Sequence, residues 1–295
     1  MSPVLAPSCL AFAVSLAAAQ TLSREGAFEK LALVSANDPK TWAPAECTAT
    51  PSTERAKIGA TSWHWHVDVD HFAGEAKYPI GWPRISHAIP DGPLRDWSAW
   101  DFLHAWIYVD TSRATLPKEP AGLGVAAPDR ANTYNRALAD LKKGEWVELN
   151  VPVAALPRPG DVRSLQFHIS EANYRHGDRL DVYVNDLALV RYAEPTLFAF
   201  SPENAVLFSD AKRLPVRLQL LGVKPGGRAA IACELRREGK VAARGSAEAG
   251  RGPQRVVLAL AGQPLAPGEY ELRASVAGQP QPATAKVRVV DSPWR

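Results

Sequence analysis

The chain has 295 residues, of which 46% are hydrophobic, and its formal net charge is +3. This length is typical of two domains, each large enough to bury a core of its own. Residues 196–295 carry 15 Lys and Arg against 8 Asp and Glu, but these basic residues are scattered along the sequence without a longer run. The composition therefore argues against nucleic-acid binding, which needs a continuous basic stripe.

The N-terminal segment 1–19 has the pattern of an export signal. An apolar run from Leu10 ends in three alanines, Ala17 to Ala19, which is typical of a cleavage site, and the run is too short to span a bilayer. We expect an exported protein without a membrane span, either secreted, periplasmic or at the cell surface. The alternative is a segment without a targeting role, because no Lys or Arg precedes Arg24.

Cysteine usage predicts no disulfide within a domain. Cys9 lies in the signal segment, and Cys47 and Cys233 fall in different predicted domains.

The next informative segment is 62–70, Ser-Trp-His-Trp-His-Val-Asp-Val-Asp, which alternates strictly between apolar and polar residues. Side chains of a strand point alternately to its two faces, so the Trp and Val residues predict one buried row. The other row contains His64, His66, Asp68 and Asp70. Imidazole and carboxylate groups are unusual as mere solvent cover, and we interpret this row as a candidate binding surface.

The first region reads as short strands separated by Pro, Gly and Asp, which is the pattern of an all-β sandwich. Its expected strands are 53–58, 62–70, 78–87, 102–110, 121–126, 145–151, 163–170 and 180–190. One short amphipathic helix is expected within 133–143, where Tyr134, Leu138 and Leu141 have helical spacing.

The composition changes near Pro195. Eight of the nine tryptophans lie at or before Trp146, and Ala, Arg, Val and Leu dominate after the change. We place a jelly-roll domain at 20–194 and a second domain at 195–295. The second domain has expected strands at 206–208, 215–221, 229–236, 254–260, 270–276 and 283–290. Its size and strand pattern predict a smaller immunoglobulin-like sandwich.

Several segments of the first region resemble one family. They are Asp96–Leu103 with the strand that follows to Asp110, Gly144–Pro152, Asp161–Ile169 and Leu180–Leu189, and Glu54, Gly59 and Ser62 match the family's opening segment. In this order they resemble the galactose-binding-like jelly rolls that serve as carbohydrate-binding modules in exported bacterial proteins. The resemblance covers about residues 40–192 and implies the fold more than the ligand. It also implies a structural Ca²⁺ held by carboxylates such as Glu54 and Asp186, with a solvated pair of turn residues as the alternative. The His64-X-His66 strand and the segment 81–84 have no counterpart in that pattern.

The strand assignments predict one shared face that combines aromatic rings with hydrogen-bonding groups. A sugar needs this combination, because its C–H face stacks on a ring while its hydroxyls require donors and acceptors. The alternative is that these side chains pack beneath a loop or a neighbouring domain. The candidate ligand-binding residues are His64, His66, Asp68, Trp82, Arg84, His104, Trp106, Tyr108, Gln166 and His168.

A transition-metal site made of His64, His66 and either His104 or His168 is a second interpretation. We expect no such metal, because no carboxylate or third His close in sequence fixes the geometry. No nucleophile or phosphate-loop motif occurs, and the carboxylates cannot be assigned acid and base roles.

The sequence thus predicts an exported, non-catalytic glycan-binding protein that needs no cofactor beyond a possible Ca²⁺. Its second domain would act as a spacer or bind a protein partner. The alternatives are a jelly-roll enzyme, acting on polysaccharide or using a His-ligated metal, and a structural cell-surface adaptor.

Overall fold

The computed structural model describes residues 28–35, 38, 40–73, 80–260, 264–279 and 281–293. The predicted signal segment 1–19 and Cys9 lie outside these residues. Cys47 and Cys233 are both free thiols. The described part is all-β, with four short 3₁₀ turns between strands, and none of its helices has the length and hydropathy to cross a bilayer.

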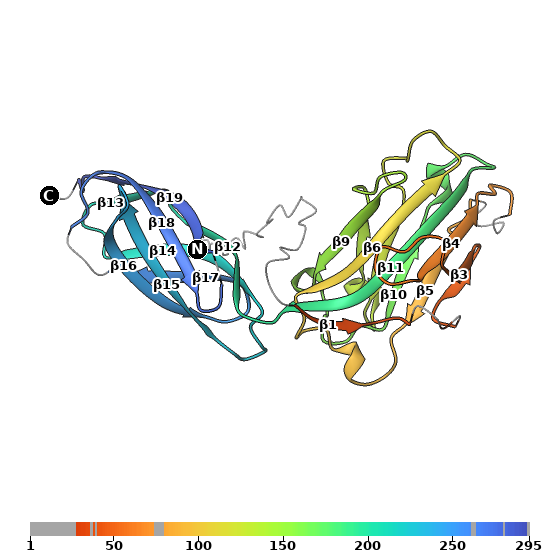
Figure 1. Ribbon diagram of the computed structural model, residues 1–295, viewed down its shortest axis with the longest axis horizontal. Helices are drawn as coiled ribbons and strands as arrows, with labels where there is room; N and C mark the ends of the chain where they lie inside the picture. Colours follow the sequence, from red (N-terminus) through yellow and green to blue (C-terminus); the bar gives the residue numbers. More distant parts are fainter. Residues whose placement is uncertain are drawn as a thin grey trace, which may run out of the picture.

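The strands before residue 193 form two antiparallel sheets (Figure 1). Sheet I has the order β3-β4-β11-β6-β9, and β1 also pairs with β11 beyond a bulge between Asn185 and Ala188. Sheet II has the order β2-β5-β10-β7-β8. The strands of sheet I are β1 (Phe28–Ala32), β3 (Thr48–Ser52), β4 (Ser62–Asp68), β6 (Phe102–Thr111), β9 (Trp146–Pro152) and β11 (Arg179–Tyr192). Those of sheet II are β2 (Ala43–Ala45), β5 (Arg84–Ala88), β7 (Gly122–Ala126), β8 (Tyr134–Ala137) and β10 (Ser164–His168).

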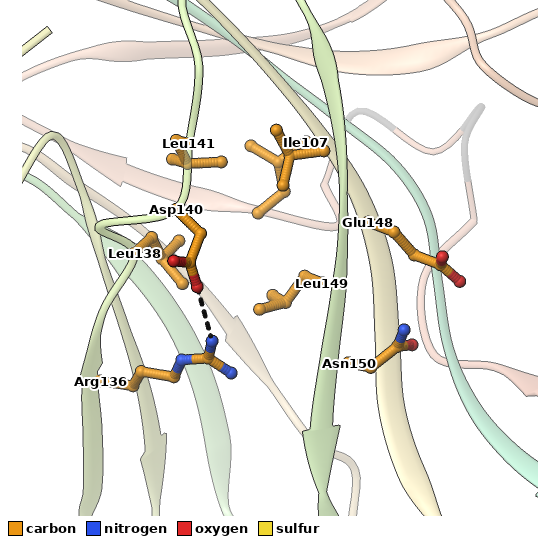
Figure 2. A pocket seen from close by; sticks show the side chains of 9 residues that line it. Ile107, Arg136, Leu138, Asp140, Leu141, Glu148, Leu149 and Asn150 are labelled. Atoms are coloured by element: carbon orange, nitrogen blue, oxygen red, sulfur yellow. Dashed lines mark hydrogen bonds and ion pairs between the residues drawn. The ribbon is translucent and has the colours of Figure 1, made fainter. Parts of the chain in front are cut away.

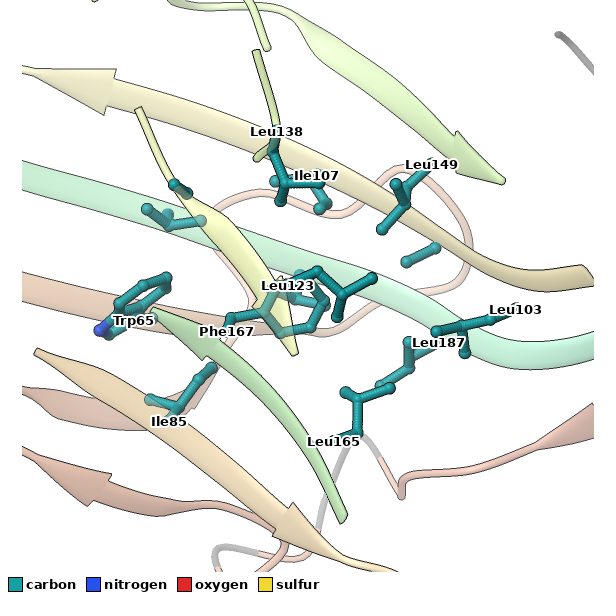
Figure 3. Packing of buried hydrophobic residues seen from close by; sticks show 14 of the residues in the cluster. Trp65, Ile85, Leu103, Ile107, Leu123, Leu138, Leu149, Leu165, Phe167 and Leu187 are labelled. Carbon is teal, nitrogen blue, oxygen red and sulfur yellow. The ribbon is translucent and has the colours of Figure 1, made fainter. Parts of the chain in front are cut away.

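The two sheets pack face to face around one hydrophobic core. Trp65 of β4 and Leu103 of β6 belong to the same core cluster as Ile85 and Phe167 of sheet II (Figure 3), and all four are almost completely buried. The apolar row predicted within 62–70 is therefore inside. Since each sheet turns its apolar row inward, the polar rows of the two sheets point in opposite directions.

Strands β12 to β19 form a second pair of sheets with a separate core. The three-stranded sheet has the order β12-β14-β17, and the five-stranded sheet has the order β13-β19-β18-β15-β16 with β13 parallel to β19. Their bounds are β12 (Thr196–Pro202), β13 (Val206–Phe208), β14 (Arg213–Leu221), β15 (Ala229–Arg237), β16 (Lys240–Ala249), β17 (Gly252–Ala259), β18 (Gly268–Val276) and β19 (Ala283–Val290).

Two expected elements of the first region were wrong. Residues 53–58 form a loop, and the strand lies just before them as β3. The expected helix within 133–143 is replaced by β8, which pairs with β7, and a turn follows. In the second case non-local pairing overrides a short helical pattern, because two amphipathic turns are too few to be stable alone. The strands β1, β2, β12 and β16 were missed.

A buried contact joins the two pairs of sheets. Only residues 193–195 separate β11 from β12, and Phe102, Val190 and Tyr192 pack there against Leu221. Asp101 has a completely buried side chain, accepts hydrogen bonds from the backbone N–H groups of Tyr192 and Gly222, and pairs with Arg251.

The separate cores lead to a prediction about residues 21–194. Expressed alone, this fragment should fold and unfold in one cooperative transition, because its core cluster contains no residue after 192. Circular dichroism during urea titration would measure this. A fragment without a cooperative transition would contradict the proposed division at residue 195.

Candidate functional site

The predicted binding face is divided between the two sheets. Strands β4 and β6 belong to sheet I and β5 and β10 to sheet II, so their polar rows lie on opposite outer faces. The expectation of one shared face was therefore wrong, since alternation fixes the faces of each strand but not the sheet that it joins. His64, His66, Asp68, His104, Trp106 and Tyr108 lie with sheet I. Trp82, Arg84, Gln166 and His168 lie with sheet II.

Three of the sheet I residues are buried, and side chains of a loop lie over two of them. His104, Trp106 and Tyr108 are all less than 10% exposed. Arg55 lies 4.5 Å from the centre of the Tyr108 ring, and Lys57 lies 4.8 Å from the centre of the Trp106 ring. His104, Trp106 and Tyr108 are therefore packing residues, which was the alternative interpretation of the sequence. None of them offers an exposed ring on which a sugar could stack.

The loop that lies over two of these residues is held by β11. Backbone N–H groups of Lys57 and Ile58 donate to Asn185 Oδ1, at 3.2 and 2.8 Å. The Asn185 amide donates in turn to the carbonyl oxygens of Ile58 and Thr61. Four hydrogen bonds from one buried side chain fix residues 57–61 against sheet I.

The carboxylates expected to bind Ca²⁺ have different protein partners. Glu54 Oε2 accepts a hydrogen bond of 2.8 Å from the Tyr183 hydroxyl. Asp186 is paired with Lys30 and lies 3.6 Å from His104 Nε2. Burial raises the pKa of Asp186, but His104 and Lys30 outweigh that effect and lower it. A cationic neighbour opposes binding of a further cation, so this pair does not fit a Ca²⁺ site.

His64 and His66 are partly exposed and share a carboxylate that the sequence did not reveal. Asp181 of β11 lies opposite His66 in the strand register. Its Oδ1 atom is 2.7 Å from His64 Nε2 and 2.8 Å from His66 Nδ1. Burial lowers the pKa of His66, but hydrogen bonding and charge from Asp181 and Asp68 raise it above its ordinary value. Only the strand pairing could have identified Asp181, because it lies 115 positions from His66.

The outer face of sheet II has long polar side chains beside very small ones. His168 has Arg84 on one side and Gly122 on the other in the register. The next row along the strands contains Ala43, Ser86, Gln166, Gly124 and Asn135. A Cβ atom on Gly122 would lie only 2.3 Å from His168 Nε2, so the imidazole rests directly on this glycine. Both glycines are buried, because the His168 imidazole lies on Gly122 and the Asn135 and Gln166 side chains lie beside Gly124.

Trp82 stands at one end of that surface. Its side chain is 49% exposed, and its ring centre lies 4.9 Å from that of His168 in an edge-on arrangement. The Trp82 backbone is fixed by Glu46, whose Oε2 accepts the Trp82 N–H at 2.6 Å, and the Arg84 guanidinium donates to the Trp82 carbonyl. These two hydrogen bonds fix the backbone of Trp82, and its half-exposed indole ring presents an apolar surface to solvent.

Two buried polar atoms of this surface lack hydrogen-bond partners. They are Gln166 Nε2 and His168 Nδ1. A buried donor or acceptor without a partner costs about 1–3 kcal/mol. Both atoms have almost no accessible surface, so a ligand would bond to them only after these partly exposed side chains moved. Burial lowers the pKa of His168, which keeps its imidazole neutral at neutral pH.

This burial predicts a pH dependence of stability. In the folded chain burial holds the pKa of His168 below its value in the unfolded chain, which is about 6.5. The unfolded state therefore gains protons first, and stability falls as the pH drops through that value. We expect His168→Gln to lose less stability than the native chain between pH 7.5 and 5.5, measured by urea unfolding. Coincident pH profiles would contradict this assignment.

The structure also has a small apolar pocket outside both faces (Figure 2). Ile107, Leu138, Leu141 and Leu149 line it between β8 and β9, and an ion pair of 3.3 Å joins Arg136 to Asp140 at its side. Ile107 and Leu149 belong to the inner row of sheet I, so this pocket is a gap at the open edge of the sandwich. Its lining offers hydrogen-bonding groups only at the margin and does not favour a sugar.

The chain was compared with known proteins. No protein-family model matches it, and no curated protein matches its sequence. Among solved structures, it is similar to an exo-β-agarase, with 8% identity and a TM-score of 0.39 over 55% of this chain and 24% of that one.

Two further similar structures are carbohydrate-binding modules. A family 11 module from Clostridium thermocellum, solved with a mixed-linked tetrasaccharide, has 12% identity and a TM-score of 0.32, covering 54% of this chain and 96% of the module. A tandem of family 22 modules from Paenibacillus barcinonensis has 10% identity and a TM-score of 0.34, covering 83% of this chain and 87% of that one. These scores are too low to carry a functional argument, which therefore depends on the residues.

Proposed function

We propose that the protein recognises a glycan on the outer face of sheet II. The observation that carries this proposal is the half-exposed Trp82 beside the partly exposed polar side chains of Gln166 and His168 on one outer face. The indole supports stacking against the C–H face of a sugar ring, and the polar atoms support hydrogen bonds to its hydroxyls.

We further propose that this binding is not accompanied by cleavage. In the described part of the chain, two carboxylates beside this face are engaged in holding the backbone. Glu171 accepts backbone N–H groups of Asp70 and Gly81, and Glu46 accepts that of Trp82. Hydrolysis of a glycosidic bond normally requires one carboxyl group to give a proton and a second to act as base or nucleophile. Carboxylates committed to backbone donors are poorly suited to both roles.

The role proposed for the second sandwich is that of a spacer or a surface for a protein partner in an exported protein. Its sheet orders, β12-β14-β17 and β13-β19-β18-β15-β16, support the expected immunoglobulin-like arrangement. In that arrangement strands A, B and E share one sheet and strands C, F and G the other, and β12, β14 and β17 correspond to A, B and E when the short β13 is left out of the count.

The test is a glycan array followed by titration of the strongest ligand. Trp82→Ala should weaken binding by about 1–3 kcal/mol, because it removes the apolar stacking surface, while circular dichroism remains unchanged. Phe208→Ala is the matched control, since this aromatic is 45% exposed but lies in the second sandwich. Equal binding by native and Trp82→Ala chains, or no glycan bound by either, would refute the proposal.

Trp106→Ala distinguishes the two faces of the first sandwich. Because Trp106 is 8% exposed and covered by Lys57, this change should lower stability without removing binding from the molecules that remain folded. Selective loss of glycan binding in a fully stable Trp106→Ala chain would place the site on sheet I instead.

A further inference from the structure

A second cluster on the opposite side of the sandwich has the composition of a metal site. Strands β4 and β11 are neighbours, and their register sets Asp181 opposite His66 and Tyr183 opposite His64. His64 Nε2, His66 Nδ1 and a carboxylate oxygen of Asp181 all lie within 4.8 Å of one another. Within the described part of the chain, this is the only group of three or more His, Cys, Asp or Glu residues that meets this condition.

The donor set matches the preferences of first-row divalent ions. Imidazole nitrogen and carboxylate oxygen are the ligands that Zn²⁺ takes at about 2.0–2.2 Å. Both rings already point at one carboxylate oxygen, at 2.7 and 2.8 Å. Ligand atoms held tetrahedrally by one ion at these bond lengths lie about 3.4 Å apart. The three side chains would therefore have to move apart by roughly half an ångström to admit an ion.

Neighbouring side chains orient both imidazoles. The ring of His64 stacks on Tyr183, with centres 4.6 Å apart and planes within 8° of parallel. The other nitrogen of His66, Nε2, lies 3.3 Å from Asp68 Oδ2. A metal-bound histidine commonly donates its free N–H to such a carboxylate, which fixes its tautomer and makes it a better ligand. Asp68 therefore has the position of a supporting residue for a ligand at Nδ1.

The cluster is also accessible to an ion from solution. The side chains of His64, His66 and Asp181 are 24%, 32% and 38% exposed. Two neutral imidazoles and one carboxylate provide three ligands, and a fourth position would remain open to water or another ligand.

We propose that His64, His66 and Asp181 bind Zn²⁺ or a similar divalent transition ion, with Asp68 orienting His66. This site is independent of the glycan proposal, because it lies on the other sheet. Sequence reasoning rejected a transition metal for want of a third ligand, and strand pairing supplies that ligand from residue 181.

The experiment is titration of the untagged full chain with Zn²⁺ by isothermal calorimetry at pH 7.5. The native chain should bind one equivalent. His66→Gln and Asp181→Asn should each remove this binding, whereas Asp68→Asn should retain it with affinity reduced by about 10-fold to 100-fold, the usual effect of losing a supporting carboxylate. This graded result separates a ligand from a residue that only orients one.

His176→Gln is the matched control. His176 is also near a carboxylate, 3.4 Å from Asp70, and near a second imidazole, that of His71, but it is not part of the three-ligand cluster. This variant should bind Zn²⁺ as the native chain does. Histidine NMR signals should show that Zn²⁺ perturbs His64 and His66 in the native protein. Failure of the native chain to bind, equal binding by His66→Gln, or loss of binding in His176→Gln would each overturn the proposal.

Discussion

Asp101→Ala should lower the free energy of unfolding by roughly 3–5 kcal/mol, the usual effect of removing one partner of a buried ion pair. The Asp101 side chain is completely buried and lies 3.1 Å from the Arg251 guanidinium. It also accepts the backbone N–H groups of Tyr192 and Gly222 at 3.0 and 2.9 Å. Alanine would leave two buried donors and a cation without their acceptor. Urea unfolding followed by tryptophan fluorescence measures the change.

The same substitution in the fragment 21–194 provides the control. That fragment lacks Gly222 and Arg251, so Asp101→Ala should cost clearly less there than in the full chain. The difference between the two costs measures the part of the interaction that joins the sandwiches. Equal costs in both backgrounds would show that Asp101 acts only within the first sandwich.

Phe167→Ala should destabilise the first sandwich by about 3–5 kcal/mol, the range for emptying an aromatic site in a core. Phe167 is 1% exposed and lies across from Ile85 and Leu123 in sheet II. Its ring centre is 5.9 Å from that of Trp42, and its neighbours are rigid strands that cannot collapse far into the cavity. The change is measured by urea unfolding of the full chain.

Phe167→Leu is the companion variant, and it should cost much less because it retains most of the apolar contact. Phe167 lies between Gln166 and His168 in sequence yet points to the opposite side of the strand. Phe167→Ala should therefore lower the free energy of unfolding, whereas Trp82→Ala should leave it unchanged. A cost below about 1 kcal/mol for Phe167→Ala would contradict the inward orientation of this residue.

The strands were the most predictable part of the fold. Alternation in 62–70 identified the inward row of Trp63, Trp65 and Val67, because side-chain direction in a strand depends only on position in the chain. The buried apolar row of 102–110 was found by the same reasoning. The helix expected within 133–143 failed because β8 pairs with β7, whose residues lie nine to fifteen positions away in the sequence.

The candidate site was predicted in its residues but not in its arrangement. Trp82, Arg84, Gln166 and His168 do share one region, since β5 and β10 are neighbours. His64 and Trp106 do not belong with them, because strand order within two facing sheets is set by contacts distant in sequence. Asp181 was missed for the same reason, as were the partners of Asp101.

The short link between β11 and β12 affects how the molecule would sit on a polymer. Three residues, 193–195, leave little slack, and Gly222 approaches so closely that a Cβ there would be 2.2 Å from the Glu194 carbonyl oxygen. With Asp101 and Arg251 bonded across the junction, rotation of one half relative to the other requires breaking buried polar contacts. A chain attached to a polysaccharide through sheet II would therefore present its C-terminal half in one fixed direction, so that any partner bound there approaches the polymer surface at a constant angle.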